Sequence, residues 1–193
     1  MINIQFRQAC ADDGTHLALF ADMATRRLSS YVWNLSALAG QSMFEVGRSV
    51  ICSDSDHPSY FRNWRVAEQN GEVIGALNAY VLPPPTATLL PTLEPLSGPR
   101  ELKEIAAQTF YLSAVALYQE HRGLGLGAAM LNEADLMAQT SGATRLSLML
   151  GSFNAKAHRL YLRHGFEERA RRPFIAFAGS DTQGEWILMQ KDL

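Results

Sequence analysis

The glycine-rich segment from Arg122 to Gly127 holds the residue types best suited to chemistry. It reads Arg-Gly-Leu-Gly-Leu-Gly, follows an apolar run that ends near Leu117, and precedes a helix-forming run from Ala128. Glycines at three alternate positions let a backbone approach a ligand closely. A helix starting behind them would offer unpaired N–H groups and a partial charge of roughly +0.5. With the guanidinium of Arg122, the segment predicts an anion site, most often for phosphate, ahead of a turn that only packs tightly.

Dinucleotides and nucleoside triphosphates, two common phosphate ligands, both fit this segment poorly. Gly123, Gly125 and Ala128 satisfy the dinucleotide pattern G-x-G-x-x-A. That pattern also expects an acidic residue at the end of the next strand, about 20 residues on, whereas the strand expected over Thr144–Leu150 is followed by Gly-Ser-Phe-Asn. The sequence contains no Gly-Lys-Ser/Thr, which excludes a P-loop for nucleoside triphosphates. The ligand is therefore predicted to be phosphorylated but to be neither of these.

A second motif runs from Asn154 to Phe166 and reads Asn-x-x-Ala-x-x-Leu-Tyr-x-x-x-Gly-Phe. Asn154 is suited to cap a short helix, and Gly165 is suited to end it in the left-handed conformation. The glycine-rich segment and this motif together resemble the GNAT superfamily of N-acetyltransferases. The signature of that superfamily is Q/R-x-x-G-x-G/A followed by N-x-x-A-x-x-L-Y-x-x-x-G-F. Either half alone is weak evidence, but both halves in this order and spacing are specific.

The resemblance implies a fold for the whole chain. It implies an α/β (α+β) fold in which a mixed, mostly antiparallel sheet of about seven strands is splayed between its fourth and fifth strands. About four helices would flank that sheet. The similarity covers residues 1–193 as a single domain, but it is sharp only from Val115 to Phe166.

The resemblance also implies acetyl-CoA as cosubstrate and a role for each matching residue. Backbone groups of Val115, Ala116 and Leu117 would hydrogen-bond the pantetheine arm, as an added strand would. Asn154 would hold the arm, with a plain helix cap as its alternative role. Tyr161 would be catalytic and donate a proton or hydrogen bond to the departing thiolate, with core packing as its alternative. The pyrophosphate would lie on the backbone amides of Arg122, Gly123, Leu124, Gly125, Leu126, Gly127 and Ala128.

The implied reaction is transfer of an acetyl group to the amine of a small molecule, a peptide or a protein. Direct transfer in a ternary complex is favoured, because no activated cysteine or serine constellation is visible. The alternative is a non-catalytic acyl-CoA-binding module, but the complete glycine loop together with Tyr161 favours the enzyme. The general base that accepts the amine's proton stays open. The candidates, none of them preferred, are Glu45, His57, Glu104, Glu120, Tyr111 and Ser113.

Composition narrows the class of protein. The formal net charge of −2 gives no general basic field for nucleic acid or anionic lipid. No apolar run is long enough to span a bilayer, and the N-terminus lacks the pattern of an export signal. Cys10 and Cys52 are predicted to be reduced core residues rather than a disulfide or a metal site. We therefore expect a cytoplasmic protein with no nucleic-acid, membrane or metal partner, and homodimerisation is left open.

Apolar periodicity and turn residues predict the elements that must position both motifs. Prolines crowd between Pro83 and Pro99, where an extended connection is expected. A short helix over Arg100–Ala107 would turn Leu102 and Ile105 inward. Four other helices are expected. The first starts at Asp12 or Asp13, and its apolar pattern continues to Leu28; the second starts at the capping box Ser42–Glu45. The third runs over Leu124–Gln139, and the fourth lies between Asn154 and Gly165. The expected strands are Ile2–Arg7, Trp64–Gln69, Glu72–Leu82, Thr109–Tyr118, Thr144–Leu150, Phe166–Phe177 and Glu185–Lys191.

Overall fold

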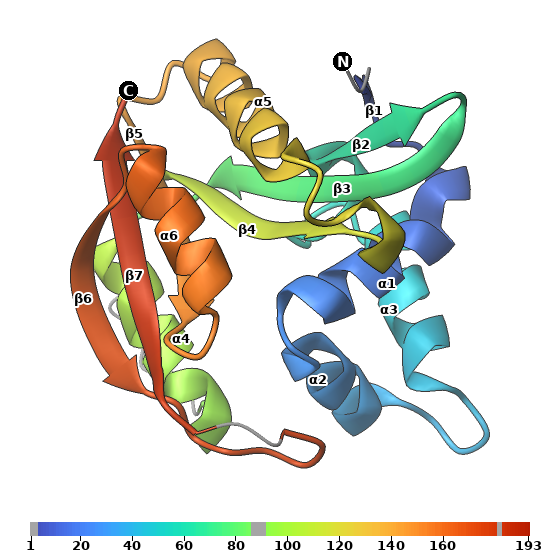
Figure 1. Ribbon diagram of the computed structural model, residues 1–193. Helices are drawn as coiled ribbons and strands as arrows, with labels where there is room; N and C mark the ends of the chain where they lie inside the picture. Colours follow the sequence, from blue (N-terminus) through green and yellow to red (C-terminus); the bar gives the residue numbers. More distant parts are fainter. Residues whose placement is uncertain (1–3, 86–91, 181–182) are drawn as a thin grey trace. The chain divides into compact units, whose positions relative to one another are not determined.

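In the part of the chain that the structure describes, seven strands form one sheet in the order β1-β2-β3-β4-β5-β7-β6 (Figure 1). This computed structural model describes residues 4–85, 92–180 and 183–193. The residues fall into two compact units. The first unit comprises Met1–Ala79, Ala114–Met130 and Ala178–Ser180, and the second comprises Tyr80–Ser113, Leu131–Phe177 and Asp181–Leu193.

Three antiparallel strands and three helices make up most of the first unit. The turn between β2 and β3 holds Asn70 at φ 53° and Gly71 at φ 82°. Both are left-handed, as a two-residue hairpin of this type requires, so the predicted hairpin is confirmed. The bounds are β1 Gln5–Gln8, α1 Gly14–Ala24, α2 Leu28–Ser36, α3 Met43–Ser53, β2 Trp64–Gln69 and β3 Glu72–Val81, whose last two residues belong to the second unit.

The capping box that starts α3 is confirmed atom by atom. The backbone N–H of Glu45 donates to Ser42 Oγ at 3.2 Å, and the backbone N–H of Ser42 donates to Glu45 Oε2 at 2.6 Å. These two bonds satisfy backbone donors that a helix start leaves unpaired. At the N-terminus the predicted strand begins at Gln5, and Ile2 lies outside the described residues.

The core of the first unit fixes one face of β4 (Phe110–Leu117), whose residues from Ala114 onward belong to this unit. Ala114 and Ala116 both join the buried hydrophobic cluster. Because side chains alternate along a strand, those of Val115 and Leu117 point to the other face. The largest members of the cluster are Leu17, Phe20, Trp33, Ile51, Trp64 and Val66.

The second unit holds the rest of the sheet. β4 pairs in parallel with β5 through Phe110–Leu112, whereas β7 pairs antiparallel with both β5 and β6. The predicted mixed, mostly antiparallel sheet is therefore confirmed. The remaining bounds are α4 Glu94–Ile105, α5 Leu126–Thr140, whose residues to Met130 belong to the first unit, β5 Arg145–Gly151, α6 Ala155–Arg163, β6 Glu167–Pro173 and β7 Glu185–Asp192.

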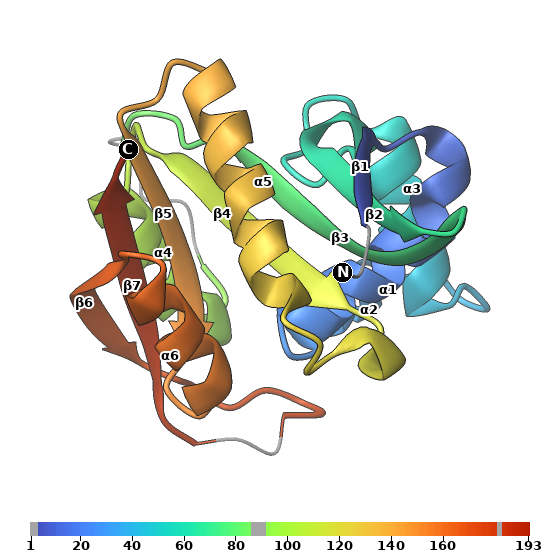
Figure 2. The same cartoon turned by 45° about the horizontal axis from the view of Figure 1, so that its top comes forward.

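Helices α4 and α6 lie on opposite faces of β7 (Figures 1 and 2). Gly98 on α4 packs 3.6 Å from Trp186, measured from the position a Cβ would take. On the other face, Lys191 Nζ lies 5.5 Å from the ring centroid of Phe166, the residue that follows α6 closely. Trp186 and Lys191 are an odd number of residues apart, so a strand directs their side chains to opposite faces. This arrangement buries both sides of the C-terminal strand.

The prediction of about four helices was wrong, because the described residues form six α-helices. The first expected helix breaks into α1 and α2, since Arg26 at φ 54° and Arg27 at φ 71° adopt left-handed conformations that end a helix. Apolar spacing continues across this break to Leu28, so the pattern alone hides it.

The expected extended connection over Pro83–Pro99 was also partly wrong. Helix α4 starts at Glu94, inside that segment, with one proline in its first turn and Pro99 in its interior. Proline is tolerated in a first turn, where its missing N–H has no helical partner to lose. The face of α4 differs from the prediction as well: Leu102 is fully buried as expected, but Ile105 is exposed and Ala106 is buried in its place. Residues 86–91 of the segment lie outside the described residues.

Several smaller features of the described residues complete the fold. Arg169, Arg171 and Arg172 lie close together in the sequence, and each pairs with a nearby glutamate. Cys10 and Cys52 are both free thiols, but Cys10 is exposed rather than in the core. Among the described helices none has the length and apolar character to cross a bilayer. No cluster of three or more potential metal-ligating side chains occurs in the described residues.

Candidate functional site

The glycine-rich loop has the backbone conformation that only glycine adopts freely. Gly123 lies at φ 79° and Gly125 at φ 80°, and a Cβ at either position would have no atom of the described residues within 4 Å. The chain therefore needs glycine at both positions for its left-handed dihedrals, and no atom in the described part of the protein crowds the space into which a side chain would point. Helix α5 begins directly afterwards at Leu126 and runs for 15 residues. Its first N–H groups face this loop as a helix N-terminus does, which suits an anion.

Arg122 connects the loop to the end of β4. Its Nε donates to the carbonyl oxygen of Leu117 at 2.9 Å, while the side chain is exposed. A guanidinium has further N–H donors beyond Nε, and these suit phosphate oxygens. This hydrogen bond fixes the positive charge of Arg122 beside the glycine-rich loop.

The backbones of three β4 residues were expected to bind a cofactor arm, and the register of β4 shows which edge of the strand each of them faces. Tyr118 N–H donates to Ile74 O on β3 at 2.9 Å, and the Cβ position of Gly75 lies 2.6 Å from Ala116 O. Ala116 and Tyr118 therefore turn their backbone groups towards β3. Backbone groups alternate between the two edges of a strand, so those of Val115 and Leu117 face the other edge. We expect Val115 and Leu117 to make the strand-like bonds.

In the second unit, Asn154 and Tyr161 occupy one short helix. Asn154 caps α6, because its side-chain oxygen accepts from Ala157 N–H at 3.4 Å. At the other end, Gly165 at φ 88° allows Phe166 N–H to donate to Tyr161 O at 3.0 Å and Gly165 N–H to donate to Leu162 O at 3.1 Å. These two bonds form a complete Schellman cap, as the motif predicted.

Tyr161 is buried, with 7% of its surface exposed, and its ring meets that of Phe166 edge-on at a centroid distance of 5.8 Å. Burial raises the pKa of the Tyr161 phenol to about 12. Desolvation disfavours the charged phenolate, so the hydroxyl stays protonated over the whole physiological range. Such a group can donate a proton or a hydrogen bond and has no charge of its own to repel a thiolate.

The predicted site residues thus lie in two groups. Val115 through Ala128 belong to the first unit, on the end of β4, the glycine loop and the start of α5. Asn154 and Tyr161 belong to the second unit, at the start and in the middle of α6. Each group has the local geometry that its motif requires.

Three of the six candidate bases from the sequence are engaged in other contacts. Glu45 is exposed, and its bonds to Ser42 lower its pKa, which makes it a weaker proton acceptor. His57 Nδ1 accepts from the backbone N–H of Ser59 at 3.0 Å. Glu104 pairs with Arg100 on α4 at 3.3 Å. None of these contacts points to a base.

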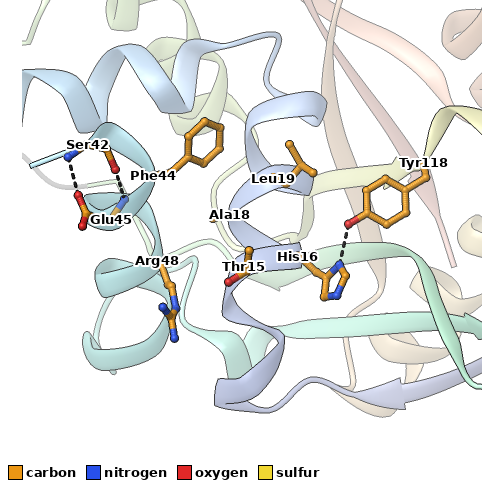
Figure 3. Close-up of a pocket in the computed structure, with 9 residues that line it drawn as sticks. All are labelled: Thr15, His16, Ala18, Leu19, Ser42, Phe44, Glu45, Arg48 and Tyr118. Carbon is orange, nitrogen blue, oxygen red and sulfur yellow. Dashed lines mark hydrogen bonds between the residues drawn. The ribbon is translucent and has the colours of Figure 1, made fainter.

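Sequence reasoning missed His16. A cavity of about 360 Å³ in the first unit is lined by residues of α1, α3 and the end of β4, and His16 and Tyr118 form part of its wall (Figure 3). His16 Nδ1 and Tyr118 Oη lie 2.6 Å apart and share a hydrogen bond. The two residues are 102 positions apart in the chain. The sequence gives no local signal for the pair, because only the packing of α1 on β4 brings them together.

The chain belongs to the GNAT acetyltransferase family. The model of the acetyltransferase (GNAT) family matches residues 29–166, which is more than half of the chain. This confirms the resemblance that the two motifs indicated. No curated protein matches the sequence.

Solved structures share the fold at low sequence identity. A GNAT-family acetyltransferase from Streptococcus pneumoniae is 19% identical at a TM-score of 0.59, with 99% of this chain and 100% of that chain covered. YncA from Salmonella typhimurium, solved with its cofactor acetyl-CoA, is 19% identical at a TM-score of 0.61, with 98% and 94% covered. The PaiA N-acetyltransferase of Thermoplasma acidophilum, in complex with coenzyme A, is 15% identical at a TM-score of 0.55, with 99% of each chain covered.

Proposed function

We propose that this protein transfers an acetyl group from acetyl-CoA to the amine of an acceptor. The observation that carries the proposal is the glycine loop, where left-handed Gly123 and Gly125 lead into the N-terminus of α5 beside Arg122. Family membership supports the reaction class, and neighbours with the same fold were solved with acetyl-CoA or coenzyme A. Together these observations favour acetyl-CoA as the cosubstrate.

The proposed binding mode uses backbone groups for most contacts. The amides from Gly123 to Gly127 hold the pyrophosphate at the start of α5. The N–H groups of Arg122 and Ala128, which the resemblance also implied, donate instead to Gln119 O at 3.1 Å and Gly125 O at 3.3 Å. Val115 and Leu117 bond the pantetheine arm along the edge of β4 that faces away from β3, as an added strand would. Asn154 holds the same arm from the start of α6. Because these contacts are made by the backbone, glycine dihedrals and strand register matter more here than side-chain identity.

The proposed chemistry is direct transfer. The unprotonated acceptor nitrogen attacks the thioester carbon, so a C–N bond forms as the C–S bond breaks. Tyr161, whose phenol is protonated, donates to the departing thiolate. An acyl-enzyme would need an activated nucleophile, and neither the exposed Cys10 nor Cys52 belongs to the proposed site. The acceptor must therefore bind together with acetyl-CoA.

Acetyl-CoA and coenzyme A are expected to raise the melting temperature. A ligand that binds only the folded form stabilises it by about 2.7 kcal/mol at a hundred times its Kd, which is about 5–10 °C for a chain of this size. Thermal scans with acetyl-CoA, coenzyme A, NAD and ATP make the comparison. A shift with NAD or ATP and none with saturating acetyl-CoA would contradict the proposed cosubstrate.

A further inference from the structure

The cavity of about 360 Å³ has the properties of a small-molecule site (Figure 3). Ala18, Leu19 and Phe44 supply apolar walls, and the His16–Tyr118 pair supplies a polar corner. Ligand pockets of about 300–1,000 Å³ typically combine apolar lining with a few placed polar groups. All of these residues belong to the first unit, which also holds Val115 and Leu117 of β4 and the glycine loop.

Packing holds the polar corner in one arrangement. The ring of Phe20 lies 4.6 Å from the ring of Tyr118 and 6.5 Å from that of His16, measured between centroids. The backbone of Tyr118 is bonded to β3, and Tyr118 directly follows Leu117 in the chain. The side chain that orients the imidazole is therefore attached to the strand end that is proposed to hold the cofactor arm.

The chemistry of this corner is proton transfer. Imidazole is the side chain that changes charge between pH 5 and 8, and it is the most frequent general base. When His16 Nδ1–H donates to Tyr118 Oη, the opposite nitrogen, Nε2, keeps its lone pair for a ligand. Burial, followed by the charge of Glu120, raises the pKa of Tyr118, so the phenol stays neutral and can serve as this partner.

We propose that this cavity receives an acceptor amine that carries an apolar group, and that His16 takes the amine's proton while Tyr118 orients the imidazole. The inference rests on the proposed function and deepens it. An alkylammonium ion gives one proton to His16, which later passes it to solvent. The freed lone pair then forms the C–N bond, the C–S bond breaks, and the second amine proton finally resides on the CoA sulfur.

Two carboxylates near the cavity, those of Glu45 and Glu120, fit a cationic amine that arrives from water, whereas Arg48 on the same helix as Glu45 adds a positive charge. Glu45 and Arg48 of α3 line the side opposite Tyr118, and Glu120 lies beside Tyr118. Oε2 of Glu45 accepts from the backbone N–H of Ser42, which fixes the carboxylate at the rim of the cavity. A fixed carboxylate attracts an ammonium group, whereas the apolar walls hold the rest of the molecule.

The test measures kcat/KM from pH 5.5 to 9.5 with acetyl-CoA and either 2-phenylethylamine or aniline, which is already unprotonated at neutral pH. We expect His16→Gln to lose about 10²–10⁴-fold at pH 7 with 2-phenylethylamine. The loss should become smaller at high pH, because a larger fraction of the amine is then already unprotonated in solution. It should also be much smaller with aniline. Imidazole in the buffer should restore part of the activity of His16→Ala, and Tyr118→Phe should lose about threefold to tenfold.

Two matched controls separate catalysis from folding. His158→Gln removes a histidine that pairs with Glu168 in the second unit and should keep wild-type rates. Leu19→Trp fills the cavity from a partly exposed position, so it should lower kcat/KM for the amine while the acetyl-CoA thermal shift persists. Leu35→Trp places the same ring on the exposed face of α2 and should change neither.

Several outcomes would overturn the inference. One is a pH-independent loss in His16→Gln without imidazole rescue in His16→Ala, which is the behaviour of a structural residue. Others are a wild-type rate in His16→Gln, full activity in Leu19→Trp, or no turnover of 2-phenylethylamine by a wild-type protein that acetylates other amines. If acetyl-CoA gives no thermal shift and no amine is acetylated, the proposed function itself fails, which is a distinguishable result.

Discussion

Replacement of Gly125 by valine is expected to weaken acetyl-CoA binding by at least about 100-fold while the chain still folds. Gly125 lies at φ 80°, where a β-branched residue is strained, so the loop must change its course. No atom of the described residues lies within 4 Å of the new Cβ, so the branched side chain would enter the space proposed for the pyrophosphate. Calorimetric titration of the variant with acetyl-CoA measures the loss.

Gly142 provides the matched control for this variant. It lies at φ 76° and follows the other end of α5, and here too no atom in the described part of the chain lies within 4 Å of a Cβ position. Valine at either glycine should cost about 1–2 kcal/mol of folding stability, because the left-handed conformation is equally unfavourable. Only Gly125→Val should lose acetyl-CoA. Normal affinity in that variant would mean that the loop is only a packing turn.

Replacement of Tyr161 by phenylalanine is expected to lower kcat and kcat/KM together by about 10²-fold, the lower end of the range for general acid catalysis. The ring, its edge-on contact with Phe166 and the Schellman cap all remain, so the variant loses only the donor. A CoA thiol is a fairly good leaving group, which limits the loss. The interaction strengthens as charge develops on sulfur, so the affinity for coenzyme A should stay nearly unchanged.

The pH profile adds a second measurement for Tyr161. Burial holds the pKa of its phenol at about 12, so the donor should stay protonated below that pH. We therefore expect no alkaline loss of wild-type activity from this group up to about pH 11. Tyr60→Phe, outside the proposed site, should keep full activity. A wild-type rate in Tyr161→Phe, with chemistry shown to be rate-limiting, would leave Tyr161 as a core residue only.

The parts of the fold that sequence predicts are those set by local chemistry. Asn70-Gly71, the Ser42–Glu45 capping box and the Gly165 cap each need particular residue types at fixed spacing, and each has the expected geometry. The glycine loop belongs to the same class, because its left-handed dihedrals are a property of its own residues. Such features can be recognised without knowing the rest of the chain.

Features that depend on distant parts of the chain were not predictable in the same way. The break at Arg26 and Arg27 places two arginines in left-handed conformations. Arginine is not a residue type that indicates such a turn in a sequence. The buried face of α4 depends on its packing against β6 and β7, and Ile105 is exposed whereas Ala106, directly after the helix, is buried. The edge to which Ala116 turns its carbonyl depends on the register of β4 against β3. The contact between His16 and Tyr118 likewise exists only in the folded chain.

Release of the CoA thiol by the wild-type protein tests the central claim most directly. The protein is incubated with acetyl-CoA and a panel of primary amines that includes 2-phenylethylamine, lysine-containing peptides and polyamines, and free thiol is followed against a no-acceptor control. We predict amine-dependent thiol release, with one acetyl group on the acceptor nitrogen for each thiol formed. Acetyl-CoA binding without amine-dependent release from any acceptor would contradict the account and indicate an acyl-CoA-binding module instead.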